Sequence, residues 1–214
     1  MQRITCLFLS SFVVLLLLAQ NSFAVGLGGF FDASGGSGEA EWENNYNSWD
    51  IDSNAYAFGF VLDTAPTNEN TFNYRLNLGF AKQELKDVDN NKLKSNGIYI
   101  ENIFGFAFIK NETFRWWAGP LIRLGYYTGD VDSIRAGSVT IENDFDYVEV
   151  GIGAVTGLNF KVGNAVLAPS IGFRVNGFGG EGTTNETGRY GNISYKEDIT
   201  GYSNNIFANF AVLF

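Results

Sequence analysis

Large apolar side chains occupy every second position along much of this chain, and this alternation restricts the possible folds more than any other feature. In segment 98–108, apart from Asn102, the even positions are large and apolar, whereas Glu101, Gly105 and Ala107 stand at odd positions. A period of two is that of a β-strand, whose side chains point to opposite faces. The pattern therefore predicts eight strands, of which the other seven lie at 26–34, 56–63, 72–82, 114–126, 146–161, 166–176 and 202–214.

The second face of these strands is unusual for a protein that folds in water. Large polar side chains would cover the outer face of a soluble sandwich, but here Gly and Ala alternate with the large apolar residues. Small residues mixed with a few charges fit the narrow interior of a closed barrel, and bulky apolar residues fit lipid outside it. We therefore predict an all-β fold, an eight-stranded antiparallel up-and-down transmembrane β-barrel. A soluble barrel is the alternative.

The connections between the predicted strands alternate in length. Three are short, at 64–70, 110–113 and 161–164, and four are long and polar, at 43–53, 84–96, 129–144 and 178–200. Outer-membrane barrels have short periplasmic turns and longer external loops, so we expect the long loops outside the cell. Aromatic residues stand at both ends of the apolar stretches, as side chains at two membrane interfaces would: Phe72, Phe108, Phe114, Trp116, Phe160 and Phe214 near the short turns, and Tyr56, Tyr126 and Tyr202 near the long loops.

The first 24 residues have the layout of a secretory signal peptide. Arg3 precedes an apolar run from Leu7 to Ala19, and Ser22-Phe23-Ala24 supplies small residues at the first and third places. The run is shorter than the roughly 20 residues of a transmembrane helix. We therefore expect cleavage after Ala24, with 1–24 as signal peptide and 25–214 as the barrel domain.

The composition excludes several classes of chemistry. The chain has no His and one Cys, which lies in the predicted signal peptide. His-based triads, His general bases and metal sites built from His or Cys are therefore excluded. The formal net charge of −9 argues against nucleic acid, whose phosphates need Lys and Arg. We predict no enzyme and no cofactor, with a carboxylate-based enzyme as the remaining catalytic alternative.

With these features in place, the chain resembles the small eight-stranded outer-membrane β-barrels of Gram-negative bacteria, the opacity-like and OmpA-type class. The resemblance covers all of 25–214 and includes a last strand in which Phe210, Val212 and Phe214 alternate with other residues. It implies that this end is the assembly signal read by the barrel-insertion machinery, and that the barrel lies in the bacterial outer membrane against lipid and lipopolysaccharide. Pro120 and Pro169 depart from the pattern, because a bulge at either proline could shift the parity of the residues beyond it.

The charged residues of the second face are the first candidate site. They are Asp32, Asp63, Arg75, Glu101, Arg115, Arg123, Glu149, Lys161 and Arg174. Closing the hairpin of 98–126 about Glu112 places Glu101 opposite Arg123, and closing the next hairpin about Val162-Gly163 places Glu149 opposite Asn176 and diagonal to Arg174. Such charges would fill an eight-stranded interior as a plug of ion pairs. A carboxylate pair for acid/base work, or the constriction of a narrow pore for ions or small solutes, are the alternatives.

Acidic residues of the predicted loops are the second candidate site. Asp130, Asp132, Glu142 and Asp144 could hold a divalent cation or bridge through one to lipopolysaccharide phosphates. An ordinary solvated rim is the alternative. Taken together, the sequence predicts a structural or interaction role through acidic external loops on a plugged barrel.

Overall fold

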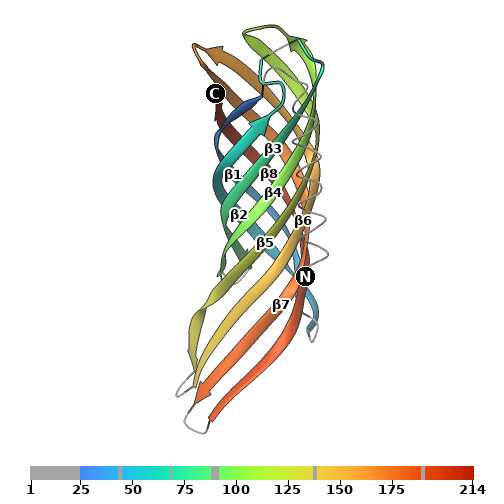
Figure 1. The fold of residues 1–214 in the computed structure, drawn as a ribbon. Helices are drawn as coiled ribbons and strands as arrows, with labels where there is room; N and C mark the ends of the chain where they lie inside the picture. The colour runs from blue at the N-terminus through green and yellow to red at the C-terminus, as the bar shows by residue number, and fades with distance from the viewer. Residues whose placement is uncertain (1–24, 43–44, 68, 88–91, 137–138, 189–190) are drawn as a thin grey trace, which may run out of the picture.

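Eight strands form a closed barrel (Figure 1). The computed structural model describes residues 25–42, 45–67, 69–87, 92–136, 139–188 and 191–214, so the predicted signal peptide lies outside the described residues. Each strand pairs antiparallel with the next, and β8 pairs with β1. The predicted fold class is confirmed. The strands are β1 (Gly26–Trp42), β2 (Asn45–Asp63), β3 (Phe72–Asp87), β4 (Lys92–Lys110), β5 (Phe114–Ala136), β6 (Val139–Val162), β7 (Ala165–Gly188) and β8 (Gly191–Leu213).

The outer face of the barrel is apolar. Phe106 on β4 is 49% exposed and Ile152 on β6 is 62% exposed, as the predicted alternation requires. The predicted tyrosines Tyr56, Tyr126 and Tyr202 are also exposed on the wall. A continuous apolar surface of this kind is unfavourable in water and favourable in lipid. Within the described ranges no helix is long and apolar enough to cross a bilayer.

The interior is filled because glycines lie beside large rings. A Cβ atom at Gly79 would come within 2.6 Å of the Tyr99 ring, and one at Gly157 within 2.5 Å of the Trp117 ring. Neither glycine can carry a side chain without displacing the ring. The small residues of the second face therefore make room for a few large side chains in a lumen of this width.

The two prolines inside strands do not shift the parity. The ladder is interrupted on the β4 side of Pro120 and on the β6 side of Pro169, as expected for a residue without an N–H group. On their other sides, toward β6 and β8, the ladders run through both prolines. The register is the same before and after each interruption, so Arg123 and Arg174 remain inside the barrel.

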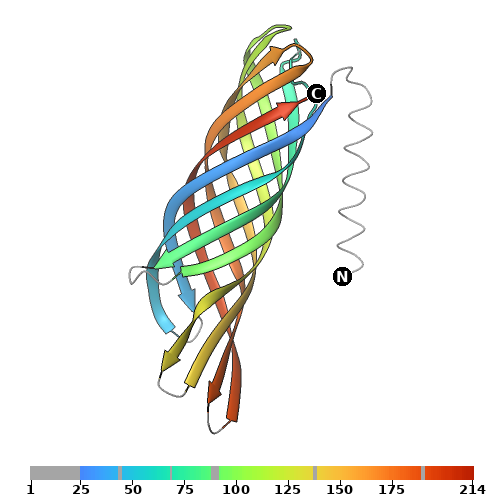
Figure 2. The same ribbon diagram turned by 90° about the vertical axis from the view of Figure 1, so that its left-hand side faces the viewer.

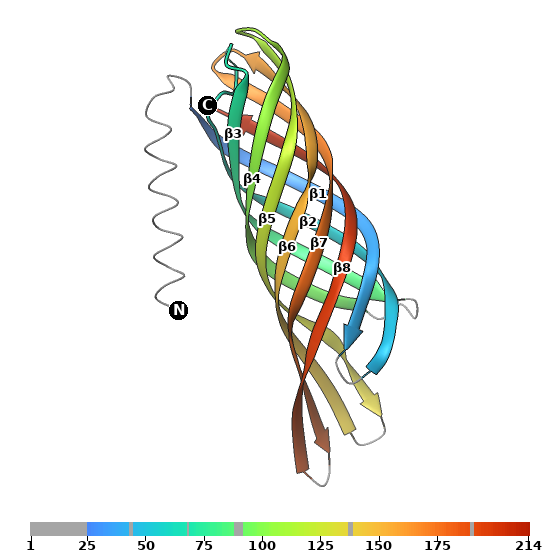
Figure 3. The same cartoon turned by 90° about the vertical axis from the view of Figure 1, so that its right-hand side faces the viewer.

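The strands are longer than predicted, and the prediction of four long loops is wrong. Most of 43–53, 84–96, 129–144 and 178–200 belongs to strands. Strands β5 to β8 contain 23 or 24 residues each, about twice the 9–11 that cross a bilayer. The β5–β6 and β7–β8 hairpins reach beyond the ends of β1 to β4 (Figures 2 and 3). The outward side chains turn polar there, but the backbone pairing continues.

The predicted register is confirmed for the β4–β5 hairpin and is wrong for the β6–β7 hairpin. Glu101 lies opposite Arg123 in the β4–β5 ladder, as predicted. In the β6–β7 hairpin, Val162 pairs with Ala165 across a two-residue turn in which Gly163 has φ 62°. This turn is centred one residue later than predicted, so every pair shifts by two residues. Glu149 consequently faces Phe178 instead of Asn176.

Candidate functional site

Charged side chains of both signs are buried inside the barrel. Seven of the eight strands contribute them, and none is more than 3% exposed. In low dielectric such charges are tolerated only when they are paired and hydrogen-bonded. These eight side chains have no net formal charge: the acids are Asp32, Asp63, Glu101 and Glu149, and the arginines are Arg75, Arg115, Arg123 and Arg174.

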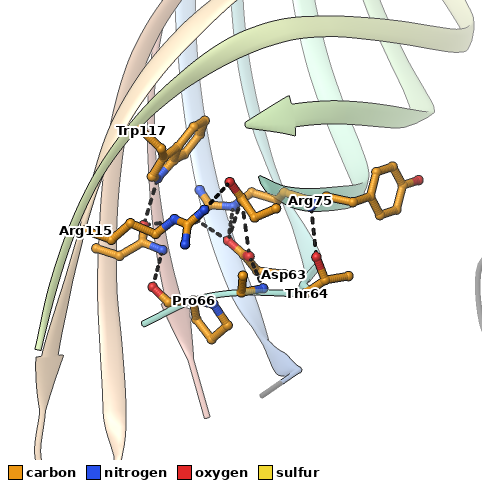
Figure 4. A network of polar contacts seen from close by, with 10 residues as sticks. Asp63, Thr64, Pro66, Arg75, Arg115 and Trp117 are labelled. Carbon is orange, nitrogen blue, oxygen red and sulfur yellow. Dashed lines mark hydrogen bonds and ion pairs between the residues drawn. The ribbon is translucent and has the colours of Figure 1, made fainter. Parts of the chain in front are cut away.

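One charge network lies at the end of the barrel with the short turns (Figure 4). Arg75 and Asp63 are opposite each other in the β2–β3 ladder, and Nε of Arg75 donates to Oδ2 of Asp63 at 2.9 Å. Nη2 of Arg75 lies 2.8 Å from the same oxygen. The other carboxylate oxygen accepts hydrogen bonds from the backbone N–H of Ala65 at 2.9 Å and from Nδ2 of Asn73 at 3.3 Å.

The connection between β2 and β3 is hydrogen-bonded to interior side chains through two of its carbonyl oxygens. Arg115 Nη1 donates to the carbonyl oxygen of Asn70 at 2.6 Å, and Asn159 Nδ2 donates to that of Pro66 at 2.6 Å. The Oδ1 atom of Asn159 in turn accepts a hydrogen bond from Trp117 Nε1 at 3.0 Å. The connection is thus fixed across the short-turn end by side chains from β5 and β6 (Figure 4).

A second network crosses the middle of the lumen. Arg174 Nη1 donates to Glu101 Oε2 at 2.8 Å, and its Nη2 lies 3.3 Å from Asp32 Oδ1. Arg123 Nη1 lies 3.9 Å from the same Glu101 oxygen, and Arg123 Nε lies 3.3 Å from Glu149 Oε1. Glu101 is therefore shared by two arginines, and the chain of charges joins strands β1, β4, β5, β6 and β7.

Aromatic rings cover the arginines of this network. The Arg123 guanidinium lies 3.5 Å from the centroid of the Tyr99 ring and donates a hydrogen bond to the Tyr127 hydroxyl at 2.8 Å. The Arg174 guanidinium lies 4.2 Å from the centroid of Phe207. These cation–π contacts and the carboxylates replace part of the water that each guanidinium loses. Nε and Nη1 of Arg123 and Nε of Arg174 have no hydrogen-bond partner among the described residues.

Sequence reasoning missed these aromatic residues, although a signal for them exists. Tyr99 stands on the small-residue parity and faces Gly79 on β3 and Gly125 on β5. Trp117 likewise faces Gly157. A large ring that faces glycine on a neighbouring strand indicates a side chain that fills the lumen. To recognise this signal in the sequence, one needs the strand pairing as well as the parity.

The predicted interior charges are placed inside with one exception. Lys161 is exposed at the short-turn end of β6 and does not join either network. The predicted pair of Glu149 and Arg174 is also wrong. The register shift places Arg174 opposite Gly153, and Glu149 binds Arg123 instead.

The acidic residues predicted to lie in a loop are on strands. Asp130 on β5 and Asp144 on β6 are opposite each other and exposed, as is Glu142, while the side chain of Asp132 lies outside the described residues. No three Asp, Glu, His or Cys side chains among the described residues converge to hold a metal ion. The cation site therefore stays a prediction without structural support.

The arrangement of the interior favours charge neutralisation over chemistry. Glu101 and Glu149 are both bound to Arg123 and neither is accessible from outside. A carboxylate that acts as a general acid or base needs reach to a substrate proton. The buried carboxylates do not offer it, since each is less than 3% exposed.

Comparison with known proteins identifies the fold. No known family model and no curated protein matches the chain. Its structure is similar to that of the outer membrane protein OprG from Pseudomonas aeruginosa, with a TM-score of 0.58 and 10% identity over 89% of this chain and 95% of that one. The translocator domain of the autotransporter NalP from Neisseria meningitidis has a TM-score of 0.47 and 11% identity over 100% of this chain and 97% of that one. The chain thus has the fold of a small eight-stranded outer-membrane β-barrel.

Proposed function

We propose that this chain is a bacterial outer-membrane protein whose lumen is closed to ions and small solutes, and that it acts through its external surface. The observation that supports this proposal best is the filled interior. Trp117, Arg75, Arg115 and Tyr127 are among the largest side chains with less than 2% exposure, and all of them point into the lumen.

The proposed barrier to conduction consists of two layers. The Asp63–Arg75 network and the β2–β3 connection occupy the short-turn end, and the Glu101–Arg123 network occupies the middle. An eight-stranded lumen is just wide enough for side chains to fill. The middle layer joins opposite charges across the lumen, and in the short-turn layer Arg75 pairs with Asp63 on the neighbouring strand and donates to Asn159 on β6. An ion would have to break these buried contacts in order to pass.

Planar bilayer recording tests this proposal. The refolded chain in a planar bilayer is expected to give no channel events above background. An open porin in a bilayer of the same composition is the positive control in a parallel experiment. Stepwise conductance that depends on the chain would overturn the closed lumen and favour the narrow pore. Heat-modifiable migration on a gel checks that the chain is folded, and flotation of the chain with lipid vesicles of the same composition checks that it inserts.

Export and assembly belong to the same proposal. We infer cleavage of the signal peptide after Ala24 and insertion by the barrel-insertion machinery through the last strand. Phe214 is exposed beyond β8 and its backbone exchanges hydrogen bonds with Leu27, so the assembly signal also completes the β8–β1 closure. Mass spectrometry of the protein from outer membranes is expected to find Val25 at the amino terminus. A chain that still begins at Met1 would contradict the cleavage.

The acidic residues predicted to lie in external loops lie on strands instead. The β5–β6 and β7–β8 hairpins present acidic residues on their outer side, among them Asp144, Asp146 and Glu181. We propose that these hairpins and the nearby wall meet the surroundings of the cell and the lipopolysaccharide of the outer leaflet. Loss of lipopolysaccharide retention on removal of these hairpins and of the nearby wall residues would support this role.

A further inference from the structure

Two adjacent apolar furrows lie on the outer wall over β1 to β5. One has a volume of about 560 Å³ and is lined by outward side chains that include Phe60, Leu78 and Leu124. The other has a volume of about 580 Å³ and includes Phe31 and Phe58. Both volumes fall within the range of sites for small ligands. The furrows are hollows between rows of side chains on the face that meets lipid, so an acyl chain fits them.

Three polar side chains border the second furrow at its end away from the short turns. Lys82 on β3, Asn96 on β4 and Thr128 on β5 line this furrow and are exposed. The three are in register, because Lys82 pairs with Asn96 and Asn96 pairs with Thr128. An amine, an amide and a hydroxyl at one edge of an apolar furrow form a set of hydrogen-bond donors for an anionic group. The exposed carboxylate of Asp146 faces Thr128 from β6 and shifts the favoured position of this group to the β3 and β4 side of the row.

The charge of Lys82 is not balanced by its neighbours in the ladder. Lys82 faces Tyr56 on β2 and Asn96 on β4, which are both neutral. The next lysines toward the external end have acidic partners. Lys92 forms an ion pair with Glu84 at 2.9 Å, for example. Lys82 is therefore the cation of this wall best placed to bind an external anion.

A third furrow, on another part of the wall, has acidic side chains in its lining where the second furrow has Lys82. It has a volume of about 670 Å³, lies over β1 and β6 to β8, and is lined by Glu39, Glu41, Val148 and Tyr202 among others. An anionic group is disfavoured there by like charge. The chain as a whole is acidic, with a net charge of −9, so Lys82 on β3 is a local basic feature of the furrows over β1 to β5.

We infer that the wall over β1 to β5 is a binding site for a phosphorylated lipid, which places acyl chains in the two furrows and a phosphate on Lys82, Asn96 and Thr128. In the outer leaflet of the proposed membrane, lipopolysaccharide has this chemistry. The inference rests on the proposed outer-membrane location and adds to it a defined site, a ligand class and a side of the barrel.

Native mass spectrometry of the refolded chain in a neutral detergent tests the inference. The probes are lipid A with two phosphates and the same lipid A after removal of both phosphates. The wild-type chain is expected to retain the phosphorylated form about fivefold more strongly, since one lysine near a membrane surface contributes about 1 kcal/mol toward an anionic lipid. The variant Lys82→Gln is expected to lose this preference while it still retains both forms weakly.

Two further variants separate charge from shape. Lys196→Gln changes an exposed lysine of β8 whose amine donates to Glu181, and its preference for the phosphorylated form is expected to equal that of the wild type. Phe80 is exposed and lines both furrows, so Phe80→Ala is expected to weaken retention of both forms of the lipid.

The result that would overturn the site is equal retention of the two forms by the wild type, or a preference that survives Lys82→Gln. Heat-modifiable migration of every variant checks that the barrel is folded, and Lys82→Gln changes only an exposed side chain. A wild-type chain that fails this folding check in detergent and in vesicles would contradict the proposed membrane location itself. A folded wild type without preference would contradict the lipid site alone.

Discussion

Arg75 is the residue on which the short-turn network depends. Its guanidinium binds Asp63 through two nitrogens, donates to Asn159 at 3.1 Å and lies 4.7 Å from the Trp117 ring centroid. Arg75→Ala would leave the Asp63 carboxylate buried without its counter-charge. We expect the free energy of unfolding to fall by about 3–5 kcal/mol, the usual cost of breaking a buried pair, in urea titrations of the chain in lipid vesicles.

Lys161 provides the matched control for this prediction. It also lies at the short-turn end, but its side chain is exposed and outside both networks. We expect Lys161→Ala to change the free energy of unfolding by no more than about 0.5 kcal/mol. If Arg75→Ala lowers the free energy of unfolding no more than Lys161→Ala does, the buried charges contribute little to stability.

At the scale of residues, sequence reasoning predicted pairs across a hairpin better than pairs across the lumen. The Glu101–Arg123 register depends on the turn near Glu112, whose position the sequence indicates, and on a register shift of one residue between Ala107 and Ile109. Arg174 reaches Glu101 from β7 to β4, which are not neighbours in the sheet. That contact depends on closure of the barrel and on the rotamers of long side chains, which parity does not determine.

At the scale of elements, the β6–β7 turn sets the register of two long strands. Gly163 has φ 62°, and no heavy atom lies within 4 Å of the position that a Cβ atom would take there. Gly163→Ala would therefore introduce backbone strain without a steric clash. We expect a loss of about 1 kcal/mol in the free energy of unfolding, measured by urea titration in vesicles.

An asparagine at the same position tests the cause of this loss. Asn adopts the left-handed region more easily than Ala, so Gly163→Asn is expected to retain most of the wild-type stability. Equal losses for both substitutions would indicate that something other than the positive φ angle requires glycine at this turn.

The extended part of the β5–β6 hairpin is predicted to be dispensable for barrel formation. Both charge networks lie closer to the short turns than Asp130 and Asp144, which pair on the two strands. Replacing 131–143 by an Asn-Gly turn, which suits a two-residue hairpin, should leave a barrel that still migrates faster on an unboiled gel. A shortened chain that migrates as unfolded before boiling would show that the hairpin is part of the folding unit.

The strands were predictable in number and parity but not in length. Lipid outside and a packed lumen inside impose alternation on residues such as those from Val148 to Phe160. Beyond the apolar wall the pattern is inverted, because Asp144 and Asp146 are exposed on the outside whereas Phe145 and Tyr147 are buried inside. The parity of the predicted strand therefore does not extend to these residues. Backbone pairing between β5 and β6 continues there nevertheless, because hydrogen bonds of the ladder do not require an apolar face.

At the scale of the whole molecule, the arrangement is the reverse of a soluble protein. Charged side chains such as Arg115 and Glu149 are in the interior, and large apolar side chains such as Phe60 and Ile206 are on the surface. Pairing of β8 with β1 from Ile199 to Leu213 closes the barrel and leaves no strand edge along it. Within the apolar wall, each residue step along a strand therefore moves between a packed interior and a surface that requires lipid.

Two adjacent tryptophans of β5 test this central claim directly. Trp116 is 43% exposed on the outer wall and Trp117 is 0% exposed inside the barrel. In single-tryptophan variants, with Phe at the other three tryptophan positions, fluorescence is measured in vesicles whose acyl chains carry bromine. The account predicts strong quenching for Trp116 and unchanged fluorescence for Trp117, whereas equal quenching of both, or quenching of Trp117 alone, would contradict it.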